Sequence, residues 1–109
     1  MAQTISTQIP EVTTRMATGA YLDTGTVAAY TFSTLGFKPR YVKVTNETDR
    51  TSIEWVEGMA DAEGIVTVAA GTRTLVTSNG ITVNSRGFIF GLDTDVNVSS
   101  KQCNFVAFG

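Results

Sequence analysis

Residues 35–48, LGFKPRYVKVTNET, decide the fold, because they contain the clearest strand pattern in the chain. Over residues 41–46 apolar and polar side chains alternate with a period of two, which predicts a strand with one buried and one wetter face. Pro39 precedes this strand and disfavours a helical conformation for Lys38, so the segment that leads into the strand is extended. The chain therefore joins a sheet at this point.

A second strand follows the polar residues 46–50, NETDR, and covers residues 52–57, SIEWVE. The polar segment suits a loop longer than a two-residue turn, so the two strands form a hairpin. Ile53 and Trp55 share one face of the returning strand, and Glu54 lies on the other. We expect Glu54 to lie across from Lys43, where an exposed ion pair is worth at most about 1 kcal/mol.

The remainder of the chain contains further short strand candidates, separated by glycine and polar turns. They cover residues 19–22, 26–33, 65–69, 73–77, 81–84, 87–92, 95–99 and 104–108. Residues 78–80, Ser-Asn-Gly, give the strongest turn signal, since asparagine and glycine tolerate positive φ. The fold class is therefore all-β, a compact β-sandwich or barrel of about eight to ten short strands with an extended N-terminal arm.

The length of 109 residues and the hydrophobic content of 42% suit one domain with a modest core. Residues 1–18 form the expected arm, and residues 19–109 form the single β domain. The apolar residues of the arm, Ile5, Ile9 and Val12, are too sparse for a core element. The arm is either a frayed terminus or an extended segment that adds to a strand edge of a neighbouring subunit.

The charge balance argues against two classes of partner. The formal net charge is -2, so no cationic field attracts nucleic acid or anionic lipid. No apolar run approaches the roughly 20 residues that span a bilayer, and the N-terminus lacks the features of a secretory signal. We therefore expect a soluble protein whose partners include neither nucleic acid nor a membrane.

The residues that usually carry catalysis and metal binding are scarce. Histidine is absent, which removes the commonest general base, and Cys103 is the only cysteine. Its apolar, strand-like context favours an inert thiol over a nucleophile. Asp93 and Asp95 would share a strand face, but without further regularly spaced oxygen ligands solvated acids are favoured over a calcium site. We expect no enzyme activity, no catalytic residue, no cofactor and no metal.

Two sets of side chains are candidates for binding. Basic residues around the hairpin suit an acidic patch on a partner, although an ordinary solvated strand face is the alternative; they are Lys38, Arg40, Lys43 and Arg50. Aromatic residues in an all-β domain can stack on sugar rings, although core positions are the simpler interpretation. These residues are Tyr21, Tyr30, Tyr41 and Trp55.

The segments GFKPRYVKVTNETDR, IEWVEGMA, TRTLVTSNGITV, GFIFGLDTDVNV and FVAFG resemble a group of small structural proteins of tailed bacteriophages. The resemblance covers residues 26–109, is most specific in the hairpin and leaves the arm unmatched. Proteins of this kind are similar to capsid decoration proteins, also called cement or minor capsid proteins. Similar modules occur in phage fibres and tails, and the resemblance implies no catalytic residue.

This resemblance implies a virion structural protein that is made in the host cytoplasm and bound to the outer capsid surface. Its partner would be the major capsid protein, whose capsomers it would hold together, and it would form a homo-oligomer, expected to be a trimer. The residues expected at the contacts are Ile5, Ile9, Val12, Arg15, Lys38, Arg40 and Lys43. The alternative is a receptor-recognition module of a tail fibre or capsid fibre that binds glycans.

Overall fold

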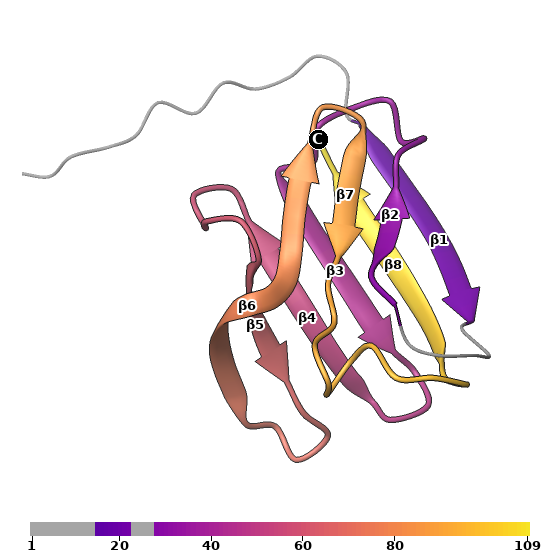
Figure 1. The fold of residues 1–109 in the computed structure, drawn as a ribbon, viewed down its shortest axis with the longest axis vertical. Coiled ribbons are helices and arrows are strands. Elements are labelled where there is room, and N and C mark those ends of the chain that lie inside the picture. The colour runs from indigo at the N-terminus through magenta and orange to yellow at the C-terminus, as the bar shows by residue number, and fades with distance from the viewer. Residues whose placement is uncertain (1–14, 23–27) are drawn as a thin grey trace, which may run out of the picture.

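A computed structural model describes residues 15–22 and 28–109, which form one sheet of eight antiparallel strands curled into a half-barrel (Figure 1). The strands are β1 (Met16–Leu22), β2 (Tyr30–Phe32), β3 (Tyr41–Asn46), β4 (Thr51–Val56), β5 (Glu63–Thr67), β6 (Arg73–Asn84), β7 (Gly87–Phe90) and β8 (Gln102–Phe108). Their order in the sheet is β1-β8-β3-β4-β5-β6-β7-β2. The all-β prediction is confirmed, and the described part of the chain has no helix that could cross a membrane.

Strand β1 begins at Met16, three residues before the predicted boundary between arm and domain. Met16 lies opposite Phe108 in the register, so this part of the predicted arm belongs to the sheet. The predicted arm residues Ile5, Ile9 and Val12 lie outside the described residues, as do residues 23–27.

The central hairpin of β3 and β4 forms as its alternation predicts. Val42 lies opposite Trp55 and Val44 opposite Ile53, and all four side chains are buried. Side chains on this inner face fill the interior of the half-barrel, whereas the residues between them point outward. The predicted position of Glu54 opposite Lys43 is also confirmed.

Strand β6 makes the corner at which the sheet curls. Its residues 73–76 pair with β5 and its residues 81–84 pair with β7. The register with β5 shifts at the corner, because Gly64 lies opposite Val76 whereas Glu63 lies opposite Ile81. Asn79 has a φ of 60° at this corner. The tolerance of Asn79 for positive φ was therefore predicted correctly, but the chain reversal predicted for residues 78–80 is wrong, because the strand bends there and continues.

The last strand of the sheet, β2, folds back over the first. The ring centroid of Phe32 lies 4.6 Å from that of Phe105 on β8, and those of Tyr30 and Tyr21 are 3.9 Å apart. The aromatic side chains of β2 therefore lie on the core side of the sheet. These ring contacts join the two ends of the curled sheet across its interior.

The strand predicted over residues 95–99 is also wrong, because residues 91–101 form a series of turns before β8. The carboxylate of Asp93 accepts a hydrogen bond from the backbone N–H of Asp95, at 3.0 Å. The side-chain amide of Asn97 donates to the carbonyl of Gly91, at 2.8 Å. Such local bonds from aspartate and asparagine side chains compete with the pairing of a strand.

We predict that Gly80→Ala lowers the free energy of unfolding by about 1–3 kcal/mol, because an added methyl group is overpacked at the corner of β6. A Cβ atom at Gly80 would collide with the carbonyl oxygens of Ala62 and Glu63. Denaturant unfolding measures the change. The control is Ser78→Ala at an exposed position of the same strand, which should change the stability by less than about 0.5 kcal/mol. Equal effects of the two variants would contradict the role of the corner.

Candidate interaction surface

The structure brings three of the predicted contact residues together. Arg15 precedes β1, and Lys38 and Arg40 lie in the segment that enters β3; all three line one hollow of about 550 Å³. We call this site the basic hollow. The buried Pro39 and Trp55 also line it, as do the acidic Glu57 and Asp61. The cations therefore outnumber the carboxylates around a partly apolar hollow.

Backbone contacts position Arg40 at this hollow. Its N–H donates to the carbonyl of Phe108 at 2.7 Å, and its carbonyl accepts from the N–H of Glu57 at 2.8 Å. The guanidinium Nε lies 3.5 Å from the carboxylate of Glu57, and both side chains are more than half exposed. Such an exposed pair adds little stability, so an acidic group of a partner can compete for the arginine.

The predicted basic cluster is divided between two places. Lys43 and Arg50 line a second, shallower hollow of about 350 Å³, away from Lys38 and Arg40. Although Lys43 lies opposite Glu54, the carboxylate of Glu54 accepts a hydrogen bond from the Tyr41 hydroxyl at 3.0 Å. The same carboxylate lies 3.8 Å from the guanidinium of Arg73.

A row of three exposed apolar side chains and the half-buried Tyr41 crosses four neighbouring strands on the outer face of the sheet. Met16 lies opposite Phe108, Phe108 opposite Tyr41, and Tyr41 opposite Val56. Because directly opposite residues project from the same side of a sheet, these four side chains share the outer face. Met16 is 59% exposed, Val56 45% and Phe108 38%. We call this set the outer apolar row.

The outer apolar row was missed by the sequence interpretation. The alternation of side chains puts Phe108 and Tyr41 on the outward face of their own strands. This was the part of the row that the sequence could indicate. The row, however, depends on the order β1-β8-β3-β4, in which strands distant along the chain become neighbours. No local pattern in the sequence contains that order.

The Tyr41 hydroxyl is held in its neutral form. Burial, together with the hydrogen bond and the negative charge of Glu54, raises the pKa of Tyr41 to about 12. The ring of Tyr41 lies 6.1 Å from that of Phe108, centroid to centroid. The middle of the outer apolar row is therefore an uncharged aromatic pair at neutral pH.

The other predicted aromatic residues lie in the interior. Tyr21 and Tyr30 pack against the hydrophobic core, and the buried Trp55 donates from its ring Nε1 to the carbonyl of Ala60 at 3.1 Å. Among the four aromatic candidates for sugar contact, Tyr41 is thus the one on the outer face. Its neighbour Phe108 completes the aromatic surface available there.

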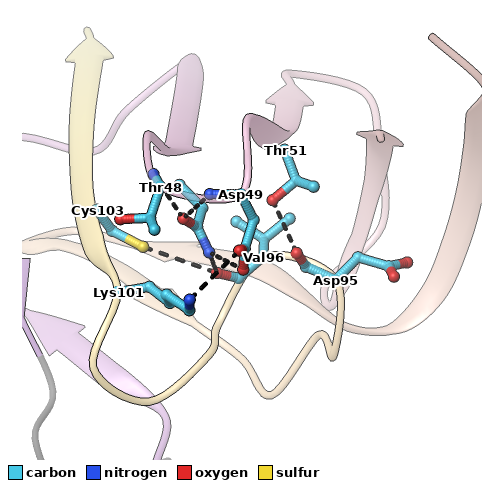
Figure 2. Close-up of polar contacts among 8 residues, drawn as sticks. Thr48, Asp49, Thr51, Asp95, Val96, Lys101 and Cys103 are labelled. Atoms are coloured by element: carbon cyan, nitrogen blue, oxygen red, sulfur yellow. Dashed lines mark hydrogen bonds and ion pairs between the residues drawn. The ribbon is translucent and has the colours of Figure 1, made fainter. Parts of the chain in front are cut away.

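A polar cluster lies at the opposite end of β3, and Figure 2 shows its contacts. Asn46 belongs to this cluster and is fully buried. The Asn46 amide nitrogen donates to the Val96 carbonyl at 3.0 Å and to the Asp49 carboxylate at 3.2 Å. Its amide oxygen accepts from the backbone N–H groups of Thr48 and Asp49, at 3.1 and 3.0 Å. This side chain therefore joins the β3–β4 loop to the segment before β8.

Further contacts in the same cluster hold the segment 91–101 in place. The Thr51 hydroxyl donates to the Asp95 carbonyl at 2.7 Å, and the Lys101 ammonium lies 3.6 Å from the Asp49 carboxylate (Figure 2). Cys103 is also buried here, with its sulfur 3.7 Å from the Val96 carbonyl. Burial raises the pKa of the Cys103 thiol, which disfavours the reactive thiolate.

The two acids considered as calcium ligands do not share a strand face. Asp93 and Asp95 lie in the turns before β8, and burial raises the pKa of the Asp93 carboxyl group. Among residues 15–22 and 28–109 there is no group of three or more acidic, cysteine or histidine side chains suited to holding a metal ion. The polar cluster is accordingly interpreted as structural.

No protein-family model, curated protein or solved structure matches this chain. The outer apolar row and the basic hollow are therefore interpreted from their own geometry and chemistry.

We predict that Asn46→Ala lowers the free energy of unfolding by about 2–4 kcal/mol, because the substitution leaves buried hydrogen-bonding partners unsatisfied. Denaturant unfolding again measures the loss. The matched control is Asn104→Ala, whose amide bonds to Glu47 at an exposed site and should cost less than about 1 kcal/mol. A control that costs as much as Asn46→Ala would refute the anchoring role of Asn46.

We predict that Glu54→Gln lowers the pKa of Tyr41 from about 12, because it removes the negative charge beside the hydroxyl. The pKa should remain above the ordinary value of 10.0, since burial is the largest cause of the shift. A pH titration of tyrosinate absorbance measures it, with Tyr41→Phe identifying the signal. An unchanged midpoint in Glu54→Gln would show that the carboxylate does not act on the hydroxyl.

Proposed function

We propose that this chain is a non-enzymatic structural protein of a tailed bacteriophage virion, a decoration protein that binds the outside of the head and stabilises contacts between capsomers. The observation that carries the proposal is the outer apolar row beside the basic hollow. The resemblance of residues 26–109 to small phage structural proteins supplies the class of partner, the major capsid protein.

The apolar content of the row supports a protein partner. Exposed apolar side chains that lie singly are ordinary on a protein surface, whereas a contiguous set with a polar border is typical of an interface. Here Met16, Phe108, Tyr41 and Val56 are contiguous across four strands. The row would form the apolar centre of the contact.

The cations of the basic hollow support an acidic patch on that partner. Arg15, Lys38 and Arg40 line one hollow, in which they outnumber the acidic Glu57 and Asp61, and Arg15 and Arg40 directly precede Met16 and Tyr41 of the row. Complementary charge would orient the protein as it approaches the capsid and would raise the association rate more than the final affinity. Binding should therefore weaken as the salt concentration rises.

The origin of the row in four hydrogen-bonded strands supports a mechanical role. A contact that spans β1, β8, β3 and β4 would distribute a pulling force over the hydrogen-bonded sheet instead of concentrating it on a single loop. On a repeating capsid lattice, many such contacts of moderate strength add through multivalency. The assembled layer would oppose separation of neighbouring capsomers under the internal pressure of the packaged DNA.

One observation favours a second function, recognition of a glycan by a fibre module. Tyr41 and Phe108 present neighbouring aromatic rings on the outer face, and such rings can stack on sugars. This function predicts binding of the isolated protein to cell-surface glycans that Phe108→Ser abolishes. The decoration function predicts binding to capsids instead.

The test measures binding of the purified chain to phage heads prepared without it. Phe108→Ser and Val56→Ser should each weaken binding by about 10-fold or more, equivalent to about 1.4 kcal/mol, because they remove apolar area from the contact. The control is Leu75→Ser, which removes an apolar side chain from β6, outside the row; Leu75 is 54% exposed, more than Phe108 or Val56. Thermal unfolding of each variant establishes that the fold is retained.

Three results would overturn the proposal. The first is the absence of head binding by the unmodified chain, and the second is a loss in Leu75→Ser equal to that in Phe108→Ser. The third is saturable glycan binding without head binding, which would establish the fibre function instead.

A further inference from the structure

Strand β1 is an edge of the sheet. Within residues 15–22 and 28–109 it pairs with β8 alone. The N–H of Gly109 donates to the carbonyl of Arg15 at 2.9 Å, so by the alternation of an antiparallel pair the odd-numbered residues of β1 bond to β8. The backbone groups of the even-numbered residues therefore point to the open edge, and these residues are Met16, Thr18, Ala20 and Leu22.

This edge lacks the usual protection against pairing. Natural edge strands are blunted by lysine or other charges, by proline, by bulges or by shortness. The sequence of β1, MATGAYL, has seven residues without charge or proline, and its register with β8 runs without a shift. The strand at the other end of the sheet, β2, has only three residues. The two edges therefore differ in their capacity to accept another strand.

We propose that β1 pairs with β1 of a second copy of this chain, antiparallel about a two-fold axis that passes beside Gly19. Each even-numbered residue then exchanges two backbone hydrogen bonds with its opposite, Met16 with Leu22 of the partner subunit and Thr18 with Ala20 of the partner subunit. The centre of the strand is occupied by glycine in both copies, so no side chain lies at the axis.

The side chains of β1 are complementary to themselves in this register. Met16 and Leu22 are 59% and 51% exposed, and both project from the outer face. The two-fold axis places Met16 of each copy directly opposite Leu22 of the other, so that the two apolar side chains of each pair make contact on the outer face. Between them the small side chains of Thr18 and Ala20 face each other without steric conflict. No like charges meet anywhere along the strand.

The use of the β1 edge also determines the symmetry of the oligomer. Pairing of β1 with itself uses the same surface on both subunits, which gives a closed dimer. The trimer expected from the sequence would require two different surfaces, and the short β2 offers few backbone groups for one of them. The self-pairing of β1 therefore replaces that trimer with a dimer.

The dimer has a consequence for the outer face. In antiparallel pairing about a two-fold axis perpendicular to the sheet, the outer faces of both copies point in the same direction. The two outer apolar rows then belong to one continuous sheet surface. The inference goes beyond the proposed function and does not depend on it, because it rests on the edge of β1 alone.

Sedimentation velocity of the full chain over a range of micromolar concentrations tests this pairing. The unmodified chain should sediment as a dimer that dissociates on dilution. Thr18→Lys combined with Ala20→Lys places like charges opposite each other and should raise the dissociation constant by about 10-fold or more. Thr18→Lys combined with Ala20→Glu places opposite charges there instead and should restore the dimer.

Two controls separate this pairing from other contacts. Thr45→Lys adds the same charge to the outer face of β3, away from the edge, and should leave the dimer intact. Deletion of residues 1–14 should also leave it intact, since β1 itself makes the contact. Circular dichroism establishes that the doubly charged variants remain folded, as their exposed positions allow.

Four results would overturn the proposal. They are a monomer at every concentration, a trimeric mass, a dimer that Thr18→Lys with Ala20→Lys does not weaken, and a dimer that is lost with residues 1–14. Failure of Thr18→Lys with Ala20→Glu to restore the dimer would exclude the proposed register. None of these results measures capsid binding, so the proposed function stands or falls separately.

Discussion

The bend in β6 is the constraint on which the rest of the structure depends. Because one strand pairs with β5 through its first part and with β7 through its last part, the sheet turns a corner without being interrupted. Hydrogen bonds from Gly80 to Ala62 and from Gly91 to Gly80 hold this corner, at 2.9 and 2.8 Å. The corner brings β7 and β2 over β8 and β1, and their aromatic side chains then fill the interior.

The curl also determines which surface is available to a partner. The side chains on one face of the sheet are buried in the interior, and a core of this size leaves apolar residues on the other face exposed. Three of the most exposed ones, Met16, Val56 and Phe108, lie where β1, β8, β3 and β4 are neighbours, and cations directly precede β1 and β3. A surface that combines apolar side chains with nearby charge is suited to a protein partner, whereas the buried polar cluster around Asn46 serves the fold.

The sequence predicted what depends on neighbours along the chain. Alternation identified the hairpin of β3 and β4 and the shared face of Ile53 and Trp55, because side-chain direction in a strand has a period of two. It did not separate a bend from a reversal at Asn79, since positive φ suits both. The predicted cations Arg15, Lys38 and Arg40 do meet, but the outer apolar row could not be predicted, because strand order is a long-range property.

The place of β8 has a consequence for how the chain folds. This strand comes last of the eight in sequence, yet it lies between β1 and β3 and provides the described pairing partner of β1. During synthesis β1 cannot pair with β8, and the edge of β3 that pairs with β8 stays open, until residues 102–108 have left the ribosome. Pairing across such a sequence separation is intrinsically slow and leaves strand edges exposed meanwhile. The sheet is therefore completed only once residues 102–108 have been made, whereas the β3–β4 hairpin can form before them.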